Sequence, residues 1–284
     1  DGSAGNDVIA PGKGNDVVTG GDGADTINMG ANLTAADAID GGAGIDKVVL
    51  NGDYSHGITF SATTMVNVET LELAQGHSYT LVMNAATVAS GATLAVTLDT
   101  AKTPSPTDVL HFNGSAVTDG AFDITGGAGN DVIVGGGLKD TIIAGAGDNT
   151  ITGGGGGDSI TAGTGADTFV YQSVSDSIGA TFDTISSVNF SNDRFDVMQP
   201  VSGIDPTLTT GTLTLSTFTI DLQNAMKNVL TAHDAVLFEP DAGSFKGHVF
   251  LVIDQNGTAG YQASGDLVIQ LSGTTGQLTA GDFT

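Results

Sequence analysis

Residues 126–170 divide without remainder into five consecutive nine-residue units, and this repeat is the feature that most limits how the chain can fold. The units read GGAGNDVIV, GGGLKDTII, AGAGDNTIT, GGGGGDSIT and AGTGADTFV. A short fixed period indicates a stack of similar units, because each one buries its apolar side only against its neighbours. The chain is therefore expected to contain a solenoid.

Each unit has a glycine-rich first half and a strand-forming second half. Glycine adopts a positive φ at little steric cost, so it suits a tight turn or a backbone that approaches a ligand. The eighth position is always large and apolar, and a short alternating strand buries that side chain while exposing its neighbours. These residues are Ile133, Ile142, Ile151, Ile160 and Phe169. Each unit is thus expected to form half of a solenoid rung.

The sixth position of the units carries Asp131, Asp140, Asn149, Asp158 and Asp167. Short carboxylates beside turn carbonyls offer the oxygen ligands that Ca²⁺ prefers, and a nonapeptide of the form G-G-x-G-x-D-x-U-x is a known calcium-binding β-helix repeat. We therefore predict that several Ca²⁺ ions are bound by these Asp residues and by turn glycines. The glycines are Gly126, Gly127, Gly129, Gly136, Gly145, Gly147, Gly154, Gly156, Gly163 and Gly165. Leu138 at a fourth position and Asn149 at a sixth position predict weaker sites in their units.

A second set of units lies near the start of the chain. Residues 2–28 hold three units and residues 41–49 hold another, which adds Asp7, Asp16, Asp25 and Asp46 to the predicted calcium ligands. Residues 29–40 between them form a unit three residues too long, which is expected to bulge as a loop from one edge. A flexible glycine-rich linker is disfavoured, because a linker would not keep an acid and an apolar residue at fixed positions.

The rest of the chain predicts strands without the nonapeptide. Runs of β-forming residues at 58–60, 68–73, 79–83, 94–98, 109–112 and 122–124 indicate longer rungs without calcium turns, with 102–106 as an exposed loop. Phe218, Leu222, Ala225, Met226 and Val229 share one helical face, with Ser216 or Thr217 as the cap. Strands are expected at 235–238, 248–253 and 267–271.

The predicted fold class is therefore all-β: a parallel β-roll or β-solenoid with calcium-binding repeats and a small β-rich C-terminal cap containing one helix. The expected divisions are a first array at 1–49, a solenoid linker at 50–125, a second array at 126–170 and the C-terminal cap at 171–284. Open solenoids need such caps to cover their last apolar rung.

The charge and Cys content of the chain limit which partners and cross-links it can use. The formal net charge is −25, from 32 acidic and 7 basic residues, and only Glu69, Glu72 and Glu239 among the acids are Glu. Such a surface is unsuited to nucleic acid, which requires clustered Lys and Arg. The chain has no Cys, so metal ions are the available cross-links. No apolar run is long enough to span a membrane. The chain opens on Asp1 without a signal-peptide pattern and is expected to be a piece of a longer protein.

Catalytic motifs are absent from the sequence. It contains no H-E-x-x-H for zinc, no G-x-S-x-G and no Cys nucleophile, and its five His are scattered, so we predict no enzyme activity. The loop from Asp254 to Asp266 leaves two interpretations open. It is either a calcium loop similar to an EF-hand, with Asp in place of the final Glu, or a hairpin loop with Asn-Gly turn chemistry.

The units at 2–28, 41–49 and 126–170 resemble those of RTX (repeats-in-toxin) proteins, a secreted bacterial group. ADTFVYQSVSDS at 166–177, with FDTI at 182–185 and NDRFDV at 192–197, is similar to the passage from β-roll to C-terminal domain in serralysin-type proteases. The segment GHVFLVIDQNGTAGYQASGDLVIQLSG, followed by LTAGDFT, is similar to the tails of RTX surface proteins.

The resemblance implies type I secretion directed by the C-terminal region and folding on Ca²⁺ outside the cell, at or beyond the cell surface. It does not carry over protease activity, because the zinc motif is missing. Two functions remain open. The chain is either a structural module of an S-layer subunit or adhesin, with self-association into a lattice or binding of cell-surface polysaccharide, or the secretion and folding module of an exported enzyme whose catalytic domain lies upstream.

Overall fold

The structure, a computed structural model, describes residues 1–98 and 105–284, and its contacts divide the chain into two units, residues 1–150 and 151–284. The larger part of the predicted loop at 102–106 lies outside the described residues, and Pro106 at its end is exposed. The four-part division expected from the sequence remains a proposal.

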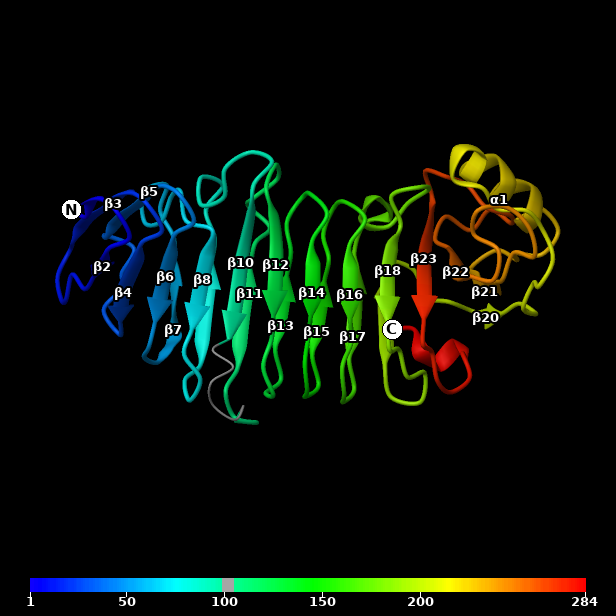
Figure 1. Cartoon of the computed structure of the whole chain (residues 1–284). Helices are drawn as coiled ribbons and strands as arrows, with labels where there is room; N and C mark the ends of the chain where they lie inside the picture. Colours follow the sequence, from blue (N-terminus) through cyan, green and yellow to red (C-terminus); the bar gives the residue numbers. More distant parts are fainter. Residues whose placement is uncertain (99–104) are drawn as a thin grey trace. The chain divides into compact units, whose positions relative to one another are not determined.

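The first unit consists of short parallel strands that follow one another as successive rungs, as Figure 1 shows for β2 to β14. One sheet has the order β2-β4-β6-β8-β10-β12-β14, a second has the order β13-β11-β9-β7, and β1-β3-β5 form a third. The strands are β1 (Ser3–Ala4), β2 (Val8–Ile9), β3 (Val17–Asp22), β4 (Thr26–Gly30), β5 (Ala38–Ala43), β6 (Lys47–Leu50), β7 (Tyr54–Thr59), β8 (Thr70–Leu73), β9 (Tyr79–Val82), β10 (Thr93–Leu98), β11 (Leu110–Asn113), β12 (Ala121–Thr125), β13 (Val132–Val134) and β14 (Thr141–Ile143), with β15 (Thr150–Thr152) at the boundary.

The eighth residue forms the core in the repeats after the first, as the pattern predicts, whereas Ile9 of the first repeat is only partly buried. Ile27, Ile133 and Ile142 are 0% exposed, whereas the strand neighbours Val132 and Ile143 are 38% and 42% exposed. Burying one such side chain contributes about 1.5–3 kcal/mol. Alternation along three-residue strands therefore sets the register of every rung.

The middle of this unit has longer rungs and an aromatic core. Turns in the repeats contact each other 18 residues apart, whereas equivalent contacts in the middle join residues 23 and 31 apart. Tyr54 stacks on Tyr79 with ring centroids 5.8 Å apart, and Phe112 meets Phe122 edge-on at 5.1 Å. These larger side chains occupy the additional interior of the longer rungs.

The three-residue insertion at 29–40 is anchored rather than bulging freely. Leu33 is 4% exposed, and its backbone N–H donates to the Tyr54 hydroxyl at 3.1 Å. The insertion lengthens its rung to 21 residues, the separation of Asp25 and Asp46, without changing which strand residues face the core. The loop follows the wall because it contributes an apolar side chain to the interior.

The second unit begins with parallel strands and ends in an antiparallel sheet. Strand β16 pairs in parallel with β18, and β18 pairs in parallel with β23. The sheet continues through antiparallel β22 and β21 to β20, and β17 pairs in parallel with β19. The strands are β16 (Ser159–Thr161), β17 (Thr168–Tyr171), β18 (Asp183–Ser186), β19 (Arg194–Val197), β20 (Gly203–Ile204), β21 (Asp234–Phe238), β22 (Val249–Asp254) and β23 (Asp266–Ser272); short 3-10 helices span Val174–Asp176, Leu215–Thr217 and Ala280–Asp282.

The α-helix of the second unit, α1 (Phe218–Met226), covers one face of this sheet (Figure 1). Phe218, Leu222 and Met226 recur every four residues and pack with Phe250 and Val252 of β22 in one apolar cluster. The helix has Thr217 as its N-cap, without a side-chain capping bond. It ends before Val229, so it is shorter than the sequence predicted. The prediction of an all-β parallel roll with one helix is confirmed for the described residues.

Candidate metal centres

The sixth residue of a repeat holds the preceding turn on its own side of the solenoid. One oxygen of Asp25 accepts a hydrogen bond from the backbone N–H of Asp7 at 2.8 Å, and Asp46 accepts one from the N–H of Asp25 at 2.8 Å. The series ends at Glu69, which accepts from the N–H of Asp46 at 2.7 Å. We call this series the carboxylate ladder.

The second oxygen of four sixth-position residues is shielded from solvent and has no hydrogen-bond partner. These atoms are Oδ2 of Asp7, Asp16, Asp25 and Asp46. A buried unpaired charge costs more than the roughly 1–3 kcal/mol of an unpaired neutral group. The salt bridges of the described residues, Lys47–Glu72 and Arg194–Asp282, do not involve these atoms. The arrangement therefore fits a bound cation.

Backbone carbonyl groups of neighbouring turns surround these oxygens. A Cβ built on Gly20 would lie 2.5 Å from Oδ2 of Asp25 and would overlap the carbonyl oxygen of Gly41. Gly44 has φ +148°, and a Cβ there would overlap the carbonyl of Gly23. Only glycine allows both this conformation and this approach. The turns thus form a cradle lined by carbonyl and carboxylate oxygens, the donor set that suits Ca²⁺.

Negative charge accumulates in this cradle. Burial raises the pKa of Asp46, and the carboxylates of Asp25, Glu69 and Asp40 raise it further. Ionising Asp46 in the folded chain is therefore unfavourable unless positive charge is supplied. A bound divalent cation would supply it.

Asp131 and Asp140 have a different arrangement, because both of their oxygens accept hydrogen bonds. Oδ2 of Asp131 accepts from the N–H of Gly127 at 2.7 Å, and Oδ2 of Asp140 accepts from the N–H of Gly136 at 2.6 Å. The φ angles of Gly126, Gly127, Gly129 and Gly136 lie outside the left-handed range. Burial raises the pKa of Asp140 to about 6. In these two turns the backbone itself satisfies the carboxylate.

The turn that contains Asn149 combines left-handed glycines, as in the first array, with a side chain that is hydrogen-bonded within the turn, as at Asp131 and Asp140. Gly145 and Gly147 have left-handed φ angles of 97° and 102°. The Asn149 amide donates to the carbonyl of Gly147 at 3.1 Å, and its oxygen accepts from the N–H of Asp131 at 2.9 Å. The neutral amide therefore uses a turn carbonyl that a cation would otherwise bind.

The remaining predicted residues lie in the second unit. Gly154, Gly156, Gly163 and Gly165 have φ angles of 98°, 122°, 103° and 130°. The N–H groups of Asp158 and Asp167 donate to Asp183 at 2.8 Å and to Asp193 at 3.0 Å. The carboxylate ladder thus recurs in this unit.

Four members of the ladder were not predicted from the nonapeptide. Asp37 accepts from the N–H of Asp16 at 2.7 Å, and Glu69, Asp183 and Asp193 act in the same way in other rungs. Each stands two residues before a buried apolar strand residue, as the sixth position does in a repeat. An acid at that spacing, without the glycines, is the signal that identifies them.

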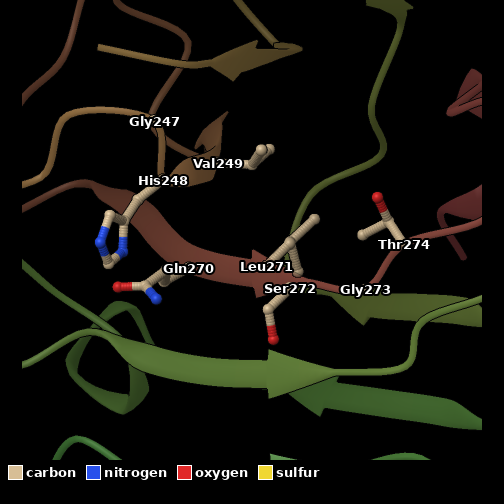
Figure 2. A pocket seen from close by; sticks show the side chains of 8 residues that line it. All are labelled: Gly247, His248, Val249, Gln270, Leu271, Ser272, Gly273 and Thr274. Atoms are coloured by element: carbon tan, nitrogen blue, oxygen red, sulfur yellow. The ribbon is translucent and has the colours of Figure 1, made fainter. Parts of the chain in front are cut away.

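The second unit also contains a pocket away from the turns, shown in Figure 2. Its polar lining is His248, Gln270, Ser272 and Thr274. His248 is the titratable side chain among its lining residues, so the lining offers no pair of groups for acid–base chemistry. The turns remain the better-supported site.

In the part of the chain that the structure describes, no three Asp, Glu, His or Cys side chains gather into a metal-holding group. Among residues 1–98 and 105–284, no helix has the length and apolar character that crossing a membrane requires.

Comparison with known families identifies the repeats. The family model of the RTX calcium-binding nonapeptide repeat (4 copies) matches residues 1–32, 123–142 and 134–169. These matches include the turns of Asp7, Asp16 and Asp25 and most of the second array. No curated protein sequence matches the chain.

Proposed function

We propose that the chain, whose repeats match the RTX calcium-binding nonapeptide, is a calcium-dependent structural module of a secreted cell-surface protein, an S-layer subunit or an adhesin. The observation that carries the calcium role is the set of buried, unpartnered Oδ2 atoms of the first array. Ca²⁺, when bound, would supply positive charge to this cradle. Asp7, Asp16, Asp25 and Asp46 are the residues that would bind it, together with turn carbonyls.

Charge and glycine content explain why such a module would fold only where calcium is available. A net charge of −25 opposes compaction, and 43 Gly increase the conformational entropy lost on folding. A ligand that binds the folded turns and not the unfolded chain shifts this balance toward folding. Inside a cell, where free calcium is scarce, the chain would remain extended. We therefore include type I secretion and extracellular folding in the proposal.

The long rungs of residues 50–125 favour the structural function over that of a secretion module. They continue the parallel sheets with aromatic packing and with rung contacts up to 32 residues apart, and residues 50–122 lie outside the residues matched to the repeat family. A module needed only for export has no use for such an extended wall. Self-association into a lattice or binding of surface polysaccharide would use this wall. A module of an exported enzyme is the alternative.

The calcium role is tested by circular dichroism of the full chain during calcium titration in chelated buffer. We expect a cooperative gain of β-signal, and Asp25→Asn should raise the calcium midpoint because it replaces the unpartnered Oδ2. Asp22→Asn, which removes an exposed carboxylate from the same turn, should leave the midpoint near wild type. A β-signal indifferent to calcium and chelator would refute the role.

The surface role is tested by electron microscopy of the purified chain with calcium. Ordered sheets support a lattice protein, and dispersed particles that bind cells or surface polysaccharide support an adhesin. A catalytic domain encoded directly upstream, with neither behaviour in the chain itself, would favour the enzyme module.

A further inference from the structure

Outside the repeats, three carboxylates form a row across β21, β22 and β23. Asp254 and Asp266 are directly opposed in the antiparallel pair of β22 and β23. Asp234 lies one residue beyond the pair formed by Ala235 and Ile253 in β21 and β22. Opposed residues of an antiparallel pair direct their side chains to one face, with Cβ atoms about 5 Å apart. We call these three residues the acidic row.

Two members of the acidic row are buried without a counter-charge, and Asp234 is partly exposed. Asp254 and Asp266 are each 0% exposed. Like charges directly opposed in a sheet are destabilising, and burial increases the penalty. The salt bridges within the described residues involve no member of the row, so Lys, Arg and His do not neutralise it at ion-pair distance. A cation or a proton must balance the two buried carboxylates.

Asp254 carries the observation that points to a ligand. Its Oδ1 accepts the N–H groups of Asn256 and Gly257 at 3.1 and 2.6 Å. Its Oδ2 is buried and has no hydrogen-bond partner. Asp266 is held beside it by the N–H of Gln262, which donates to Oδ2 at 2.6 Å. The loop therefore fixes both carboxylates and leaves one charged oxygen unsatisfied.

We propose that the acidic row is a calcium site separate from the repeats, in which Oδ2 of Asp254 and the carboxylate of Asp266 bind the ion. The two carboxylates supply oxygen donors only, which suits a hard divalent cation. Asp234 adds negative charge at the edge of the site. The site uses no residue of the repeats, so it would add a bound ion to those of the arrays. A proton shared by Asp254 and Asp266 is the competing way to balance the pair.

The test is the number of calcium ions bound per full chain, measured by native mass spectrometry. Asp254→Asn keeps the Oδ1 acceptor for the loop and should bind one ion fewer than wild type. Asp241→Asn is the matched control, because Asp241 is an exposed carboxylate of the same unit that also accepts a backbone N–H, from Gly211 at 2.9 Å. It should keep the wild-type count. A full count in Asp254→Asn, with β22 and β23 protected from hydrogen exchange as in wild type, overturns the proposal and favours the shared proton.

A second measurement does not require replacing a buried carboxylate. Terbium substitutes for calcium and emits when a nearby tyrosine absorbs, and the chain has 4 Tyr and no Trp. Tyr261 lies in the same loop and its ring packs in the apolar cluster of the second unit, so Tyr261→Phe, which keeps the ring, should leave the fold intact. This variant should lose part of the terbium emission. Unchanged emission overturns the proposal, whatever the arrays bind.

Discussion

Replacing Asp46 by Asn should have opposite effects on stability with and without calcium. In the folded chain Asp46 is 0% exposed, and its pKa is raised by burial and by Asp25, Glu69 and Asp40. A raised pKa means that ionisation at neutral pH destabilises the fold, so a neutral Asn should increase stability in chelator. The Asn retains Oδ1, which accepts the N–H of Asp25 at 2.8 Å, so the carboxylate ladder itself is kept.

With calcium present the same substitution removes a ligand oxygen. A site whose free calcium is 100-fold above its Kd contributes about 2.7 kcal/mol to the free energy of unfolding. For a unit the size of residues 1–150, about 2–4 °C of Tm accompanies each kcal/mol. Losing one ion at Asp46 should therefore lower the Tm of the first unit by about 5–10 °C in saturating calcium. The Tm of the variant should therefore lie above that of wild type without calcium and below it in saturating calcium.

The assay is thermal unfolding of the full chain by far-ultraviolet circular dichroism, once in saturating calcium and once in excess chelator with enough of a stabilising osmolyte to fold the calcium-free chain. Asp22→Asn, at an exposed carboxylate of an adjacent turn, should follow wild type in both conditions. An equal loss of Tm in both conditions would show that Asp46 acts only through its hydrogen bonds. A variant identical to wild type in calcium would exclude it as a ligand.

Three further predictions concern the core, the turns and pH. Ile27→Ala, at a side chain that is 0% exposed, should lower the free energy of unfolding by about 2–5 kcal/mol in denaturant titration. The control Ile45→Ala, at a side chain that is 72% exposed, should lower it by less than about 0.5 kcal/mol. Equal losses would contradict the assigned core. Gly44→Ala should raise the calcium midpoint, because its Cβ would overlap the carbonyl of Gly23; an unchanged midpoint would refute the cradle. Burial raises the pKa of Asp140 from 3.8 to about 6. The protonated carboxyl therefore stabilises the folded chain below about pH 4, and this contribution, about 3 kcal/mol at most, is lost as pH rises through 6. In calcium-free buffer, Asp140→Asn should remove this part of the pH dependence of the free energy of unfolding, and parallel pH profiles of variant and wild type would contradict it.

The strands of the repeats could be predicted because one rule recurs in every unit. An apolar eighth residue flanked by exposed neighbours fixes both the strand and its register, so Ile27 and Ile133 lie where the sequence places them. The longer rungs were predicted as strands, but the loops between them follow no period. Their lengths depend on large side chains such as Tyr79 and Phe122, which pack across the interior. No local pattern encodes such contacts.

Whether the second oxygen of each sixth-position carboxylate has a hydrogen-bond partner could not be predicted from the sequence. Asp25 and Asp140 stand in the same position of the same repeat, yet Oδ2 of Asp25 has no partner while that of Asp140 accepts the N–H of Gly136. The difference lies in the backbone of the turn, which the glycines permit in more than one conformation. The ladder role of Glu69 was also missed, because the glycines that mark a repeat do not precede it.

The carboxylate ladder has a direction. In every pair the N–H of the earlier turn donates to the acid of the later turn, as from Asp7 to Asp25, from Asp25 to Asp46 and from Asp46 to Glu69. Each turn therefore takes its side-chain acceptor from its successor, while a strand N–H of the successor donates to the carbonyl of the earlier turn, as from Thr26 to Asp7 at 2.8 Å. Neighbouring turns should therefore become ordered together rather than one at a time. Glu69, which no repeat glycines precede, closes the series at its C-terminal end.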